Sequence, residues 1–198
     1  HKGTIIYDQF SSTIKPPKGL FTHHIFMPSS TTIIPTIKCQ ESFLVAFTFL
    51  SFGISHLGNF MSVDEPKWLN DRVPQLYEAL ASRQWQLTEI NDKPGILPAA
   101  LSGTVNLFLN KEKYGPLELG KYLFWWRLPI LLFNFIMLFV IYNISRKLFD
   151  SDSGLLITIL ISLNPIIIGI SQIVNPDSTL WGTSFAAFLL FFLYLKTD

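Results

Sequence analysis

Residues 42–63 read SFLVAFTFLSFGISHLGNFMSV and are followed directly by Asp64 and Glu65. The stretch contains no Asp, Glu, Lys or Arg, and it exceeds the roughly 20 apolar residues that a helix needs to cross a bilayer. Pro66 suits the first turn of a helix, and Trp68 is an aromatic residue of the kind that lies at membrane interfaces. The sequence therefore predicts an acidic pair at the mouth of a membrane span.

The composition favours lipid as the solvent for much of this chain. Of its 198 residues, 49% are hydrophobic and only 15% are charged, whereas a soluble domain carries about a quarter charged residues. The net charge of +1 gives no reason to expect nucleic acid as a partner. The single cysteine, Cys39, excludes an internal disulfide. Because the chain starts at His1 and stops at Asp198 just after a hydrophobic run, we expect a piece of a longer polypeptide.

Four apolar runs with few charges predict an all-α integral membrane protein. They cover about residues 43–60, 123–145, 154–170 and 180–195. Residues 1–41 precede them as an N-terminal tail, and residues 42–198 form the membrane module. The four Lys residues of the tail, the pair Arg146–Lys147 and Lys196 all fall on one side of the membrane, which predicts a cytoplasmic tail in a multi-pass protein of the cell membrane. The long loop 61–122 then faces outward.

The outer loop has a helical pattern of its own. Its apolar positions between residues 69 and 80 share one helix face, which predicts a helix lying on the membrane surface. Trp68 and Trp85 bracket this helix as interfacial anchors, and Trp125–Trp126 mark the outer end of the second span. Residues 96–109 fit a short helix, a re-entrant segment or a surface segment equally well.

Acidic and basic residues are expected at the same depth, on the outer side of the membrane. Asp177, between the third and fourth runs, faces the same side as Asp64 and Glu65. Lys93 in the loop and Arg127 at the start of the second span share that level. A carboxylate can deprotonate a hydroxyl nucleophile, while Lys and Arg can neutralise a phosphate leaving group. This combination suits a substrate in which a sugar is joined through phosphate to a lipid.

Each of these residues also has a purely structural explanation. Asp64 or Glu65 stands where a helix N-cap would stand, and Asp177 stands where a cap of the fourth span would. Lys93 in a polar turn would be solvated, and Arg127 beside two tryptophans would reach the headgroups or stack on an indole. No metal-binding motif is visible, so we expect no cofactor. Two separated Asp residues can nevertheless hold a divalent cation.

At these residues the sequence resembles the membrane glycosyltransferases that use polyprenyl- or dolichyl-phosphate sugars. These are the protein O-mannosyltransferase family (glycosyltransferase family 39) and bacterial relatives such as the aminoarabinose transferase of lipid A. Asp64–Glu65 match the acidic pair that opens the family's first outer loop, and residues 78–85 match its pattern Glu-x-Leu-Ala-Ser-x-x-Trp. Lys93–Pro94, Arg127 and Asp177 match later features in the same order. Many bacterial members have an aromatic residue after the Lys-Pro motif, which this chain lacks.

The resemblance implies the GT-C architecture, a multi-span helical bundle with surface helices in the first outer loop and a lipid-accessible cavity. It implies that Asp64 is the general base or the carboxylate that orients the acceptor, that Glu65 supports it and that Asp177 is a second acid, which makes these three the expected catalytic residues. It also implies that Lys93 and Arg127 bind the donor phosphate.

The resulting hypothesis is a glycosyltransferase of hexosyl or mannosyl type. It would move a sugar from a polyprenyl-phosphate donor to a hydroxyl of a protein, lipid or glycan acceptor on the non-cytoplasmic face. We expect these residues to be inactive in isolation. Two alternatives stay open: a transporter or flippase fragment, and a non-catalytic membrane scaffold in which the acids are helix caps.

Overall fold

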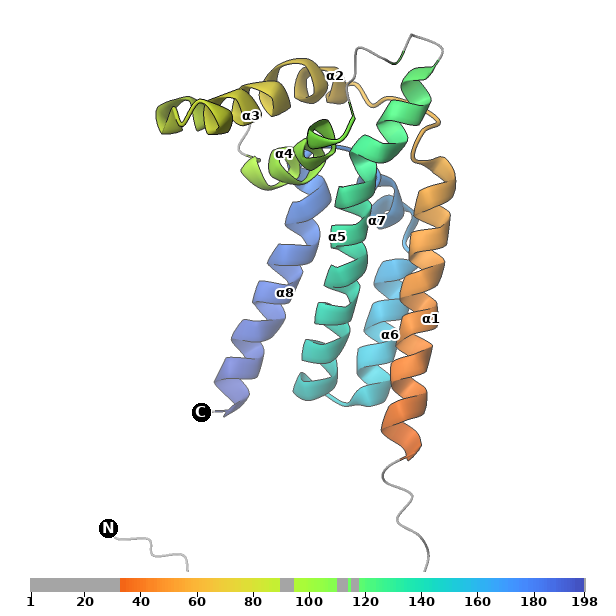
Figure 1. The fold of residues 1–198 in the computed structure, drawn as a ribbon. Helices are drawn as coiled ribbons and strands as arrows, with labels where there is room; N and C mark the ends of the chain where they lie inside the picture. The colour runs from red at the N-terminus through yellow and green to blue at the C-terminus, as the bar shows by residue number, and fades with distance from the viewer. Residues whose placement is uncertain (1–32, 90–94, 110–113, 115–117, 198) are drawn as a thin grey trace, which may run out of the picture. The chain divides into compact units, whose positions relative to one another are not determined.

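Every regular element of the described residues, which are 33–89, 95–109, 114 and 118–197, is helical. The structure is a computed structural model, and these residues all belong to one unit, Thr31–Asp198. The all-α class predicted from the sequence is confirmed for them. The main helices of the bundle (Figure 1) are α1 (Ile33–His56), α5 (Leu119–Leu148), α6 (Ser151–Ser162) and α8 (Pro176–Thr197).

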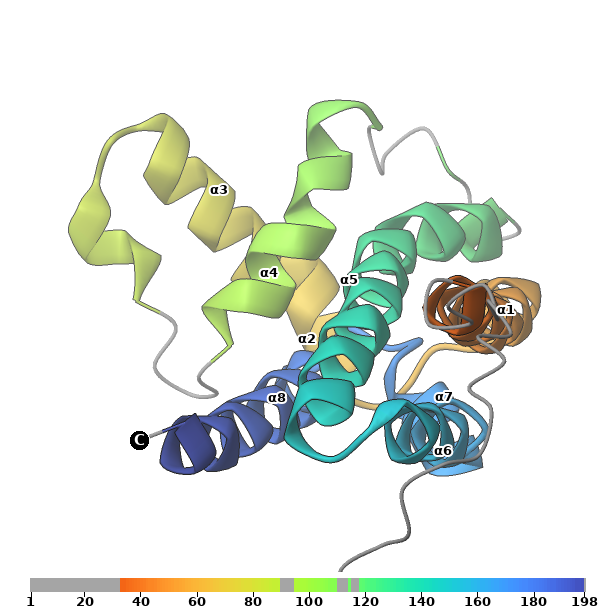
Figure 2. The same cartoon turned by 90° about the horizontal axis from the view of Figure 1, so that it is seen from below.

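Helix α5 is the centre of the bundle. It packs against α1, α6 and α8, and seen along the bundle it lies between α8 on one side and α1 with α6 on the other (Figure 2). Its inward face is mostly apolar, with Leu131, Leu138 and Ile141 fully buried. The turn into α6 brings the helices very close, since a Cβ atom at Gly154 would lie 2.9 Å from the backbone nitrogen of Arg146. Small residues at such contacts are typical of helix packing in membranes.

Two helices, α5 and α8, are long and apolar enough to cross a membrane, in agreement with the second and fourth predicted spans. Helix α1 overlaps the first predicted span but begins at Ile33 and ends at His56. The predicted boundary between tail and membrane module, at residues 41–42, therefore falls inside a helix. The first and third spans stay predictions.

The third apolar run forms two helices rather than one. Helix α6 ends at Ser162, and the short helix α7 (Pro165–Ile170) follows. The Asn164 side chain accepts hydrogen bonds from the backbone nitrogens of Ile166 and Ile167. Because Pro165 has no N–H group to donate to an earlier carbonyl and Asn is a strong N-cap, the chain restarts a helix here.

The outer loop forms a layer of short helical segments at one end of the bundle (Figure 1). They are α2 (Glu65–Lys67), the π-helical turn η1 (Trp68–Arg72), α3 (Val73–Ala81), the 3₁₀ turns η2 (Trp85–Thr88) and η3 (Thr104–Leu107), and α4 (Ile96–Gly103). The predicted surface helix is thus η1 followed by α3, and the undecided segment 96–109 contains α4 and η3. Pro74, which we expected to bend the surface helix, lies in the first turn of α3, directly after the π-helical turn η1.

The assignment of Trp68 as an interfacial anchor is wrong. Its side chain is fully buried and packs with Val73, Ala99 and Trp126 in the core of the layer. The apolar face of the outer loop rests on α4 and α5, so protein and not lipid surrounds this indole. Trp85 is 67% exposed, as an anchor should be.

Candidate active site

Asp64 and Asp177 line one cavity of about 610 Å³ at the loop end of the bundle. Asp64 comes from the start of α2 and is half-buried, whereas Asp177 comes from the first turn of α8 and is exposed. The remaining wall is mostly apolar. It is formed by Gly95, Ile96, Leu97, Pro98, Asn175, Pro176, Thr179, Leu180 and Thr183. The cavity therefore has two carboxylates beside a hydrophobic surface, and its size is that of a small-molecule site.

Gly95 lines the cavity at a position close to both Trp68 and the start of α8. A Cβ atom on Gly95 would lie 2.7 Å from Cη2 of Trp68 and 3.0 Å from Cγ of Pro176. Any side chain at this position would have to displace the buried indole or the start of α8. Glycine thus lets the loop pass between the segment that carries Asp64 and the segment that carries Asp177.

Neither acid acts as a conventional helix cap. Asp64 occupies the N-cap position of α2, but its side chain makes no capping hydrogen bond. At the start of α8 the capping role belongs to Asn175, whose side-chain oxygen accepts from the backbone nitrogen of Asp177 at 3.2 Å. The Asn175 carbonyl also accepts from the Ser178 hydroxyl. The geometry therefore leaves capping as a poor explanation for both carboxylates.

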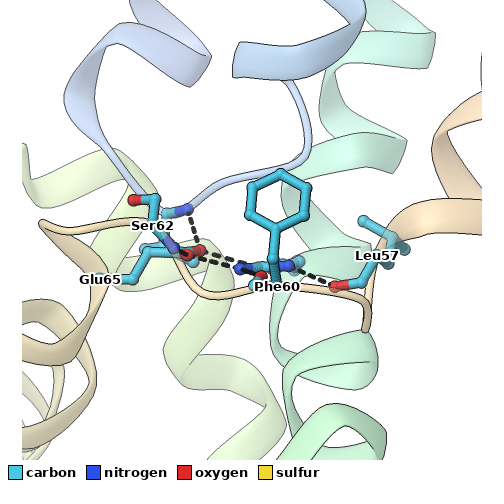
Figure 3. A network of polar contacts seen from close by, with 6 residues as sticks. Leu57, Phe60, Ser62 and Glu65 are labelled. Atoms are coloured by element: carbon cyan, nitrogen blue, oxygen red, sulfur yellow. Dashed lines mark hydrogen bonds and ion pairs between the residues drawn. The ribbon is translucent and has the colours of Figure 1, made fainter.

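Glu65 is not among the residues that line the cavity; it forms a buried ion pair with Arg127 (Figure 3). Both side chains are fully buried. The guanidinium binds both carboxylate oxygens, with Nε of Arg127 donating to Oε1 of Glu65 at 2.8 Å and Nη2 donating to Oε2. The same carboxylate accepts from the backbone nitrogens of Ser62 at 2.7 Å and Val174 at 2.9 Å.

Two further N–H groups of Arg127 also bind protein. Nη1 donates to the carbonyl of Leu57 and Nη2 to the carbonyl of Phe60 (Figure 3). All three guanidinium nitrogens thus have acceptors, and the group contacts the end of α1, the start of α2 and, through Glu65, the turn before α8.

A sequence model of the dolichyl-phosphate-mannose-protein mannosyltransferase family matches residues 117–198. Residues 117–198 are therefore similar in sequence to this family. The match confirms the resemblance read from the sequence and places the chain, at this level, among membrane glycosyltransferases with a dolichyl-phosphate-sugar donor. No curated protein and no solved structure matches the chain.

The matched region, residues 117–198, contains Arg127 and Asp177, while Asp64 and Glu65 come from the preceding segment. The cavity is thus built jointly by the matched region and the outer loop. Lys93 lies outside the described residues, so its predicted contact with phosphate stays a prediction. The part of the chain that the structure describes contains no group of three or more His, Cys, Asp or Glu side chains that would hold a metal ion.

Sequence reasoning missed the hydroxyl-bearing wall of the cavity. Thr179 and Thr183 lie one turn apart on α8, and both line the cavity. Each hydroxyl donates to a carbonyl of its own helix, at 3.2 Å to Pro176 and 2.9 Å to Thr179, so each oxygen is left to accept. The available signal was the spacing of four residues between Thr179 and Thr183, in the segment after Asn175–Pro176–Asp177, because residues i and i+4 share a helix face.

Proposed function

We propose that this chain belongs to an enzyme that transfers a sugar from a polyprenyl-phosphate donor to an acceptor hydroxyl, with Asp64 as the general base. One observation carries the proposal: two carboxylates from distant parts of the sequence, Asp64 and Asp177, line a single cavity. The family match of residues 117–198 supports the donor class and the reaction class.

The chemistry follows from the positions of the two acids. The acceptor oxygen attacks the anomeric carbon of the sugar while its proton passes to the Asp64 carboxylate. The bond between that carbon and the phosphate oxygen breaks, and the polyprenyl phosphate leaves with the electron pair. Direct attack inverts the configuration at the sugar carbon. Asp177, whose side chain makes no hydrogen bond or ion pair with the described residues, accepts hydrogen bonds from sugar or acceptor hydroxyls.

The apolar part of the cavity wall supports a lipid-linked donor. Ile96 and Leu97 from α4 and Leu180 from α8 line the cavity and remain more than one-third exposed. A polyprenyl chain next to the phosphate would lie against these side chains, while the sugar would lie beside the acids. A soluble nucleotide-sugar donor offers no apolar group for this wall.

Arg127 is a weaker candidate for the donor phosphate than the sequence suggested. Its guanidinium is buried and already binds Glu65 and two backbone carbonyls. A phosphate would have to displace these acceptors. We therefore assign the neutralisation of the leaving phosphate to Lys93, two residues before Gly95 in the sequence.

The charge distribution supports an active site on the outer face. Lys196 of α8 donates to the carbonyl of Leu148 at the end of α5, so Arg146, Lys147 and Lys196 lie together at the end of the bundle opposite the outer loop (Figure 1). Basic residues favour the cytoplasmic side. The acid-lined cavity then opens on the non-cytoplasmic side.

The test is sugar transfer by the full-length protein in membrane vesicles, with polyprenyl-phosphate mannose as the donor. Asn at position 64 keeps the size of Asp but cannot take a proton, so D64N should lower transfer by at least about 100-fold. Asp71, exposed on η1 and outside the cavity, gives the matched control D71N, which should transfer normally. Full transfer by D64N would refute the assignment of Asp64.

The break between α6 and α7 is the observation that favours a transporter, because transporters build substrate sites from interrupted helices. Here the break presents Asn164 and Pro165, and the Asn164 side chain is used to cap α7. A transporter would move the lipid-linked sugar across vesicles without releasing polyprenyl phosphate. Measuring both products in the same vesicles separates the two functions.

A further inference from the structure

The two chain segments that carry Asp64 and Asp177 are both connected to the same buried carboxylate, that of Glu65. Asp64 precedes Glu65 directly in the chain, and Val174, whose backbone nitrogen donates to Oε1 of Glu65, lies three residues before Asp177. One side chain therefore connects the segment that carries the first acid with the turn that carries the second. Arg127 fixes that carboxylate from the other side (Figure 3).

Glu65 itself is badly placed for proton transfer. Its side chain is fully buried and is not among the residues that line the cavity. Each of its oxygens already accepts two hydrogen bonds: Oε1 from Arg127 and Val174, and Oε2 from Arg127 and Ser62. A carboxylate surrounded by four donors has no exposed lone pair for an acceptor hydroxyl.

We propose that Glu65 and Arg127 are positioning residues that set the separation of Asp64 and Asp177 across the cavity. The proposal rests on the proposed function, because it assigns these two residues a task in that reaction. It also replaces the roles expected from the sequence, in which Glu65 was a catalytic acid and Arg127 a ligand of the donor phosphate.

The bonding pattern shows which substitutions loosen the arrangement. In E65Q one oxygen becomes an NH₂ group, which would face the N–H groups of Arg127 and cannot accept from them. In E65D the carboxylate is one methylene shorter, so it cannot reach Arg127 and Val174 together. In R127K a single ammonium replaces a fork that contacts one carboxylate and two carbonyls.

The first measurement is of distance and does not depend on activity. Spin labels at V63C and L180C, in full-length protein with Cys39 replaced by Ser, report the separation of the two segments by EPR; Val63 is 97% and Leu180 56% exposed. We expect a narrow distribution in the otherwise native protein and in D64N. We expect a broad one in E65Q and R127K. Glu78, exposed on α3, gives the matched control E78Q, which should stay narrow.

The second measurement is transfer kinetics without the labels. A misplacement near 1 Å can cost about 100-fold in rate, so E65Q and R127K should lose about 10- to 100-fold in kcat, with the KM for the donor changed less than about threefold. E65D keeps the charge and should fall between E65Q and the native protein.

Two results would overturn the proposal: a narrow distance distribution in E65Q, or a broad one with native kcat. If E65Q does not fold, as judged by size-exclusion chromatography, E65D and R127K decide by the same two criteria. Retained transfer in D64N would instead refute the proposed function and leave the distance result standing, so the two ideas fail separately.

Discussion

Gly58 and Gly120 face each other so closely that neither position has room for a methyl group. A Cβ atom on Gly58 would lie 2.6 Å from the carbonyl oxygen of Gly120, and one on Gly120 would lie 2.9 Å from the carbonyl oxygen of Gly58. The contact joins the end of α1 to the start of α5. It lies beside the Leu57 carbonyl that Arg127 binds, so the backbone approach and the ion pair fix the same junction.

We therefore expect G58A to destabilise the protein by about 1–3 kcal/mol, the usual range for overpacking. The backbone carbonyl that it would strike cannot rotate away as a side chain can. Thermal unfolding in detergent measures the effect. The matched control is G169A, because a Cβ atom on Gly169 in α7 would meet nothing within 4 Å. Equal melting temperatures for the two variants would contradict the expectation.

We expect the substitution G95A to change activity more than stability. In G95A the new methyl group would press on the rigid, buried ring of Trp68 and on Pro176. The start of α8, which carries Asp177, is the part able to move. We expect a drop in sugar transfer of about tenfold or more, from displacement of a reacting group, with a smaller change in melting temperature than in G58A. Native transfer by G95A would show that the cavity tolerates a wider spacing.

Tyr77 holds α3 to α4 through a hydrogen bond from its hydroxyl to the carbonyl of Ala100, at 2.9 Å. Y77F should cost about 1 kcal/mol, the usual net value of such a bond. Burial also raises the pKa of Tyr77 above its ordinary value of 10.0. A raised folded pKa means that this stability is present below about pH 10 and is lost as the pH rises through the folded pKa. The native protein should therefore lose stability above about pH 10, and Y77F should lose less over the same range, as unfolding curves at a series of pH values will show.

The class of the fold was predictable because apolar runs of bilayer length have few alternatives to helix. The meeting of Asp64 and Asp177 was also predictable, since both follow apolar runs that place them at one end of the bundle. The break at Asn164–Pro165 had a local signal, an N-cap residue followed by proline, yet the length of the apolar run suggested one continuous span.

The pairing of Glu65 with Arg127 had no local signal. The two residues are far apart in the sequence, and their contact depends on how α1 ends and how the outer loop turns back onto α5. The burial of Trp68 has the same origin. Tryptophan next to a span is typical of an interface, and only the packing of α4 over it, with Ala99 in contact, shows that protein covers it.

The cap of α7 gives a last test of the bundle. Asn164 satisfies the backbone nitrogens of Ile166 and Ile167, at 2.9 and 3.3 Å, and an unsatisfied N–H group next to lipid costs more than one next to water. N164A should therefore destabilise the protein by at least about 1 kcal/mol, whereas N164D, which keeps an accepting oxygen, should retain most of the stability.

Asn143 provides the control: it is exposed on α5 and donates to the carbonyl of Phe139 within its own helix. N143A should be neutral or slightly stabilising, since alanine has the higher helix propensity. Thermal unfolding of the three variants in one detergent separates the lost cap from the general effect of removing an amide, and equal losses in N164A and N143A would show that the cap contributes nothing.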